Sequence, residues 1–189
     1  MLLRCCLLFT FCLAHPAFAQ SRANWSGAAA ITFAGTSTLH DWAGQVAAQP
    51  FTTVVVSDAT GAPINISAKV TVAAKAMDTA EPKRDENMRK AMKVTEHPWI
   101  EAEIDAAVSE VSQDGKTPAT LPLKLKLLGK EQNVQGRISQ WKLVGKKATF
   151  DLDFDVSLKV SGIEVPSVLL FIRVGDAVKV HASVTLTQP

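Results

Sequence analysis

Apolar and polar residues alternate along most of this chain, with the period of two that a strand with one buried face requires. The clearest case is residues 150–156, where Phe150, Leu152, Phe154 and Val156 are separated by aspartates. The pattern predicts eight or more strands, found in residues 25–33, 38–47, 51–57, 64–72, 100–105, 121–127, 134–144, 150–156, 168–173 (a short piece) and 178–186.

Turn-forming residues fill the short connections between these segments. Residues 58–63 are typical of a turn, and the sequence Gln-Asp-Gly-Lys at 113–116 predicts a hairpin. Because such connections are too short to cross over a sheet, neighbouring strands should be antiparallel. We therefore predict an all-β protein, with an up-and-down barrel favoured over a two-sheet sandwich, although both architectures fit the alternation.

A charged segment, residues 77–100, interrupts the alternation and predicts the only substantial helix. Lying outside the sheet, this helix would be available to cover an opening or an edge of the barrel. The simpler interpretation is that its apolar face packs the helix on the barrel. Three features indicate the helix. Pro82 suits its first turn, and Asp85 and Glu86 lie four residues before Arg89 and Lys90, with which they can pair. Met88, Ala91 and Met92 form its apolar face.

Residues 1–19 predict a cleavable export signal, because a basic residue and an apolar run precede Ala17-Phe18-Ala19. Cleavage after Ala19 would leave residues 20–189 as one domain in the periplasm or outside the cell. All three cysteines lie at positions 5, 6 and 12, so the exported chain would have neither a disulfide nor cysteine redox chemistry. No later stretch reaches the ~18 apolar residues of a spanning helix, and we expect no transmembrane anchor.

Charge and aromatic content argue against a nucleic-acid partner. The chain has 20 Lys and Arg against 18 Asp and Glu, and these residues are interleaved without forming a basic stripe. There are 4 Trp and no Tyr, which leaves few rings for stacking bases.

Several stretches, in their order and spacing, resemble the YceI-like, polyisoprenoid-binding family. The similarity extends over essentially the whole exported chain, with departures at Ala80, where a glycine is frequent, and at Leu128, in a turn that is usually more polar. The family signatures are matched by residues 36–44 (TSTLHDWAG), 77–79 (MDT), 84–85 (RD), 88–89 (MR), 97–100 (HPWI), 127–130 (LLGK) and 174–176 (VGD). The resemblance implies an extended, lipocalin-like eight-stranded barrel that holds a polyprenyl phosphate or a prenylated quinone.

An eight-stranded barrel is wide enough for its own side chains or for one slender ligand. Small inward positions beside large ones favour a narrow tunnel. The small ones are Ala29, Ala68, Ala102, Ala148 and Ala182, and the predicted apolar walls are Phe33, Leu123, Phe150, Phe154 and Val180. We expect the lipid tail to set the affinity and polar residues at the mouth to set the orientation. No other cofactor is expected.

The candidates for contacts near the lipid head are His40, Trp42, Arg84, Asp85, Met88 and Trp99. Arg84 could donate to a phosphate or quinone oxygen, or could form a local ion pair that pins the insertion. His40 could face the tunnel, or could be a structural residue bonded to Asp85 or to a backbone carbonyl. Trp99 could instead anchor the returning strand, and Gly44 would allow a ligand or strand to approach closely.

Two other classes of function compete with lipid binding. A hydrolase is disfavoured, because Ser37, His40 and Asp41 are too close on one segment to converge as a triad and the histidines lack a metal-binding spacing. A ligand-free module with a filled barrel would instead present its helix to an envelope protein. A homodimer and an envelope redox protein as partner are left open by the sequence.

Overall fold

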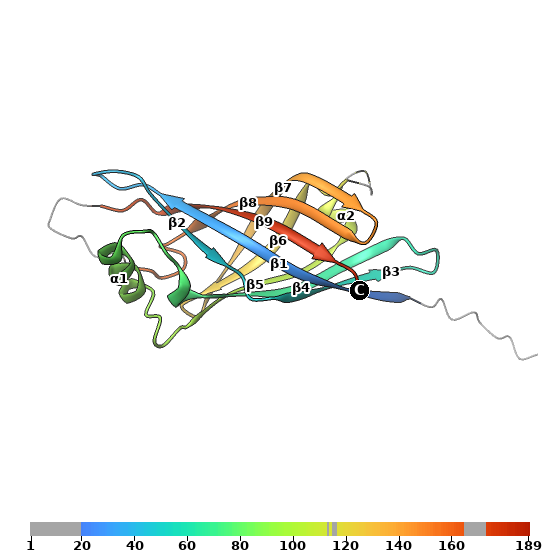
Figure 1. The fold of residues 1–189 in the computed structure, drawn as a ribbon, viewed down its shortest axis with the longest axis horizontal. Coiled ribbons are helices and arrows are strands. Elements are labelled where there is room, and N and C mark those ends of the chain that lie inside the picture. Colours follow the sequence, from blue (N-terminus) through green and yellow to red (C-terminus); the bar gives the residue numbers. More distant parts are fainter. Residues whose placement is uncertain (1–19, 113, 115–116, 165–172) are drawn as a thin grey trace, which may run out of the picture.

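In the part of the chain that the structure describes, nine strands form one antiparallel sheet that closes on itself in an elongated barrel, with the helix α1 at one end (Figure 1). The computed structural model describes residues 20–112, 114, 117–164 and 173–189. The strands are β1 (Ser21–Gly35), β2 (Trp42–Ala47), β3 (Phe51–Ser57), β4 (Pro63–Ala73), β5 (Trp99–Ala107), β6 (Thr120–Leu127), β7 (Lys130–Val144), β8 (Lys147–Ser157) and β9 (Ala177–Thr187). The helical elements are the 3-10 turn η1 (Ala74–Ala76), α1 (Pro82–Ala91) and α2 (Val108–Val111).

The nine strands occupy eight positions around the barrel because β2 and β3 lie end to end along one edge of β1. Residues 21–27 of β1 pair with β3, and residues 30–35 pair with β2. The other edge of β1 pairs with β9 from Ser26 to Ala34 and closes the barrel. The predicted all-β, eight-stranded antiparallel barrel with one short helical insertion is therefore confirmed.

The strand that was predicted for residues 38–47 begins only at Trp42. The residues before it leave β1 and turn toward the segment that precedes β9: the Thr38 amide donates to the Arg173 carbonyl at 3.0 Å, and the Gly175 amide donates to Thr36 at 2.9 Å. Of the predicted strand at 168–173, residues 168–172 lie outside the described residues, as does most of the turn at 113–116. The sequence did not predict α2, a single turn beside them.

The insertion forms α1 as predicted, with Pro82 in the first turn and the Glu81 side chain accepting a hydrogen bond from the Lys83 amide. Glu86 accepts from both Lys83 and Lys90, and these hydrogen bonds lower the pKa of its carboxyl group to about 2. The two positions where the chain departs from the family pattern, Ala80 and Leu128, both have left-handed backbone with φ of 57° and 49°. Glycine adopts this conformation without strain, whereas alanine and leucine adopt it at some cost in free energy.

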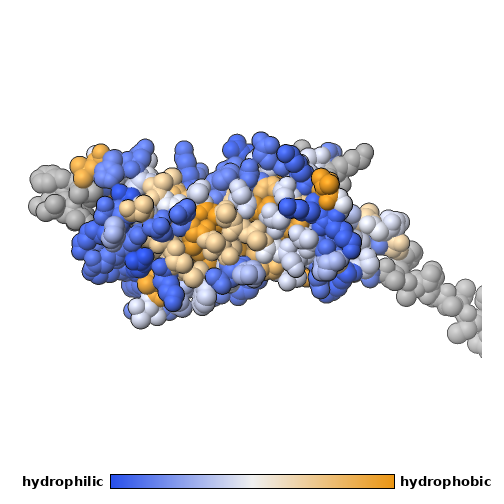
Figure 2. All heavy atoms as spheres, viewed as in Figure 1, coloured by the Kyte–Doolittle hydropathy of each residue, from blue (hydrophilic) through white to orange (hydrophobic). Residues whose placement is uncertain are grey.

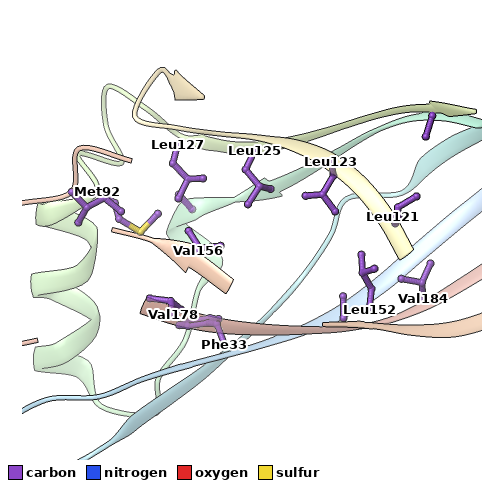
Figure 3. Close-up of a cluster of buried hydrophobic side chains, with 14 of the residues drawn as sticks. Phe33, Met92, Leu121, Leu123, Leu125, Leu127, Leu152, Val156, Val178 and Val184 are labelled. Carbon is purple, nitrogen blue, oxygen red and sulfur yellow. The ribbon is translucent and has the colours of Figure 1, made fainter. Parts of the chain in front are cut away.

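The large apolar side chains that are buried point into the barrel and are arranged in rows along its length (Figure 3). Leu121, Leu123, Leu125 and Leu127 form one row on β6, each at most 7% exposed. Phe33, Leu152, Val156, Val178 and Val184 face them from the opposite wall, and Met92 stands at the α1 end. The core of this protein is thus the lining of its barrel.

Candidate functional site

A cavity of about 820 Å³ runs through the interior of the barrel between the two rows. Its wall includes the predicted residues Phe33, Leu123, Phe150, Phe154, Val180 and Ala182, together with the predicted small residues Ala29, Ala68, Ala102 and Ala148. The alternation of the strands explains this outcome, because inward side chains repeat every second residue along each strand. The interior is hollow and its wall is almost wholly apolar.

Polar residues gather on the cavity wall where α1 meets the loop between β1 and β2. They are Ser37, His40, Thr79, Glu81, Lys83, Arg84 and Asn87. Nη2 of Arg84 lies 3.4 Å from Nε2 of His40, and because a guanidinium only donates, the imidazole nitrogen must accept. Within the described part of the chain, none of the ion pairs includes Arg84. Arg84 therefore stands without an ion-pair partner among the described residues at this mouth of the cavity, which is called the α1 mouth below.

Trp42 and Phe33 form an aromatic pair beneath the α1 mouth. Their ring centroids are 6.3 Å apart in an edge-to-face arrangement, and both rings line the cavity. Gly44 makes room for the Phe33 ring, since a Cβ there would lie 2.4 Å from that ring and 2.8 Å from the carbonyl oxygen of Asp78. The groups that approach Gly44 closely are thus the Phe33 ring and the Asp78 backbone, which belong to the protein itself. Met88 reaches the same region from α1.

Asp85 does not line the cavity, contrary to its place among the head-group candidates. The residue is 6% exposed, and its carboxylate accepts hydrogen bonds from the Thr79 hydroxyl at 2.6 Å and the Thr79 amide at 3.0 Å. Arg89 lies 4.0 Å from its other oxygen. The Thr79 hydroxyl is the main reason that the pKa of Asp85 is lowered. Asp85 ties α1 to the segment before it, and none of the hydrogen bonds or ion pairs of the described residues joins its side chain to that of His40 or Arg84.

Trp99 also lies away from the cavity. Its side chain is 49% exposed at the start of β5, while the next residue, Ile100, lines the wall. Successive residues of a strand point to opposite faces, so an inward Ile100 places Trp99 outside. The side chain lies on the outer surface of the barrel. This position agrees better with the alternative that Trp99 anchors the returning strand than with a contact to the lipid head.

Replacing Asp85 with asparagine is expected to destabilise the fold by about 2 kcal/mol at neutral pH, because the two Thr79 donors then meet a neutral acceptor in place of a charged one. The pKa of Asp85 is lower in the folded chain than in the unfolded one, so its stabilisation is present above the unfolded pKa of about 3.9 and is lost as the pH falls through the folded pKa. Urea unfolding at several pH values should show the gap between wild type and variant shrinking with acid. A gap that does not change with pH would contradict this role. Glu96→Gln is the control, because Glu96 is exposed just after the helix and takes part in none of the ion pairs of the described residues.

Sequence reasoning missed two tryptophans at the cavity end opposite α1. Trp25 has the same parity as Ala29 and Phe33 and could have been found from the alternation. Trp141 could not, because a β-bulge shifts the register between Ser139 and Lys142 and inverts the parity of the rest of β7. Its ring packs against Phe150 at 5.7 Å between centroids.

The described residues include no group of three or more side chains suited to hold a metal ion. The same part of the chain contains no helix that is long and apolar enough to cross a bilayer.

A closed antiparallel barrel around one long apolar cavity, with polar groups at one mouth, defines a lipocalin-like binding barrel. The chain belongs to the YceI-like family, because the model of the YceI-like domain matches residues 19–186. This confirms the resemblance that the sequence motifs carried.

Two solved structures share the fold. One, a polyisoprenoid binding domain from Saccharophagus degradans implicated in plant cell wall breakdown, is 11% identical with a TM-score of 0.64, covering 89% of this chain and 100% of that domain. The other, BcnA from Burkholderia cenocepacia, is 13% identical with a TM-score of 0.63, covering 83% of this chain and 95% of that one. No curated protein matches the sequence.

Proposed function

We propose that this protein binds a long-chain isoprenoid lipid, a polyprenyl phosphate or a prenylated quinone, and carries it in the periplasm. The observation that supports the proposal is the cavity itself, about 820 Å³ of space with apolar walls and polar groups gathered at the α1 mouth. The tail lies in the barrel and the head lies at this mouth. The first structural relative is described as a polyisoprenoid binding domain, which agrees with this cargo.

The volume of the cavity suits a tail of moderate length. A water molecule takes up about 30 Å³ in the liquid, and a methylene group is of similar size. The cavity of about 820 Å³ then has room for roughly 27 such groups, or about five isoprene units. Each buried methylene contributes about 0.8 kcal/mol, so the tail supplies most of the affinity.

The head of the lipid lies beside Arg84, whose guanidinium has no carboxylate partner among the ion pairs of the described residues. A phosphate can accept two parallel hydrogen bonds from a guanidinium, and a quinone oxygen can accept one. Arg84 donates to the nearby His40 nitrogen, and this contact restricts the positions that its guanidinium can take.

The geometry around His40 favours binding over hydrolysis. The Ser37 hydroxyl donates to the backbone carbonyl of His40 at 2.7 Å and accepts from the His40 amide at 3.3 Å. These bonds close a local turn and leave the hydroxyl engaged with backbone, away from the imidazole base that an activated serine needs. A ligand-free module with a filled barrel is equally disfavoured, because the interior is hollow.

Organic extraction of the natively purified protein, followed by mass spectrometry, tests the proposal. We expect a long-chain isoprenoid at about one molecule per chain, because an apolar cavity of this size binds apolar cargo tightly enough to survive purification. An extract with no stoichiometric lipid, from protein purified without detergent, would contradict the carrier function.

A further inference from the structure

The tip of the β7–β8 hairpin carries exposed apolar side chains at the end of the barrel opposite α1. Val144 is 76% exposed, the highest value among the large apolar side chains of the described residues, and Leu143 is 55% exposed. Gly145 turns the chain with φ of 57°. Figure 2 shows orange flanked by blue at the end of the molecule where Figure 1 draws this tip.

Lysines flank these apolar residues and no acidic residue accompanies them. The sequence from Lys142 to Lys147 reads KLVGKK, and residues 139–149 contain no Asp or Glu. Lys142 and Lys147 take part in none of the ion pairs of the described residues, while Lys146 donates to the Pro189 carbonyl oxygen at 2.6 Å. The tip therefore combines two exposed apolar side chains, Leu143 and Val144, with two lysines that have no ion-pair partner among the described residues.

The same tip borders the cavity. Leu143 and Trp141 both line the wall, while Val144 and the lysines do not. The β-bulge before Lys142, where Gln140 has φ of 54°, turns the Trp141 ring inward against Phe150. Any surface that binds the tip would therefore lie next to this end of the cavity.

We propose that the β7–β8 tip docks the barrel on an anionic lipid bilayer. Val144 and Leu143 enter the boundary between head groups and acyl chains, and Lys142 and Lys147 contact the lipid phosphates. A second copy of this chain is a poor occupant, because two such tips would bring positive charges together with no carboxylate between them. The proposal goes beyond the cargo, since it concerns the outer surface at the end opposite the α1 mouth.

Co-flotation of the purified protein with vesicles of phosphatidylcholine, with and without phosphatidylglycerol, tests the docking. Binding should require the anionic lipid and weaken with added salt. Val144→Asp should lower the affinity about tenfold or more, and Lys142→Gln with Lys147→Gln about fivefold for each charge removed. Val160→Asp is the matched control, because Val160 is 54% exposed in the turn after β8, at the α1 end, and does not line the cavity.

Equal loss of vesicle binding in Val144→Asp and Val160→Asp, or binding that ignores both anionic lipid and salt, would overturn the docking. A sedimentation coefficient that falls in Val144→Asp would show that the tip instead joins two copies, which also overturns it. The amount of lipid extracted from Val144→Asp should equal that of wild type. This second measurement separates a failure of docking from a failure of the proposed cargo.

Discussion

Ala29→Trp is expected to give a folded barrel that retains almost no lipid. Ala29 lines the cavity from the middle of β1, where it pairs with Val184 of β9. An indole side chain at this position projects into the space that the tail would occupy, and its apolar surface is buried by the same wall. Extraction and mass spectrometry should show the lipid falling from about one per chain to near none.

The adjacent residue provides a matched control. Ala30 lies on the same strand but is exposed on the outer face, and it is not part of the cavity wall. Ala30→Trp therefore adds the same side chain without touching the cavity, and its lipid content should equal that of wild type. Thermal unfolding should remain cooperative in both variants. Full lipid content in Ala29→Trp would mean that the cargo lies elsewhere.

Shortening the tail is expected to abolish binding even when the head group is kept. One five-carbon unit contributes at most about 4 kcal/mol, so cutting a tail of about five units to one or two should weaken binding by at least about a thousandfold. Affinity should rise with chain length and then level off near the capacity of the cavity. Titration of the delipidated protein with a series of prenyl phosphates, followed by tryptophan fluorescence, measures this.

Arg84→Gln separates the contribution of the head from that of the tail. A charge-assisted hydrogen bond contributes about 1.5–3 kcal/mol when buried, and Arg84 is only partly buried, so the loss should be about tenfold. The variant should keep the same dependence on tail length. If the wild-type protein bound lipids with short and long tails equally well, this would contradict the prediction that the tail supplies most of the affinity.

The alternating pattern predicted the strands and most of the cavity lining, while the choice of a barrel over a sandwich also depended on the family resemblance. Each strand has one inward parity, so a single correct assignment such as Phe33 places every second residue of β1 on the wall. The prediction failed where something local changes parity or direction. The bulge at Gln140 hid Trp141, and the backbone bonds of Thr38 and Gly175 delayed the start of β2.

The polar contacts of the mouth were harder to predict, because they join residues from separate elements. Arg84 meets His40 across 44 positions of sequence, and no periodicity encodes that contact. Asp85 stands next to Arg84 but is turned toward Thr79, since neighbouring residues of a helix point about 100° apart. The sequence therefore indicated which segment forms the α1 mouth. It did not indicate which side chains of that segment face the cavity.

The seam between β1 and β9 has a consequence for how the chain folds. Ser26 pairs with Thr187 and Phe33 with Val180. The backbone groups on this edge of β1 therefore stay unpaired until β9, the last strand in the sequence, has been added. Contacts of such high sequence separation raise the contact order and slow the final step of folding. A chain threaded through a translocon from its amino-terminal end would emerge with this edge open, and its barrel would close only after residues 177–187 have crossed.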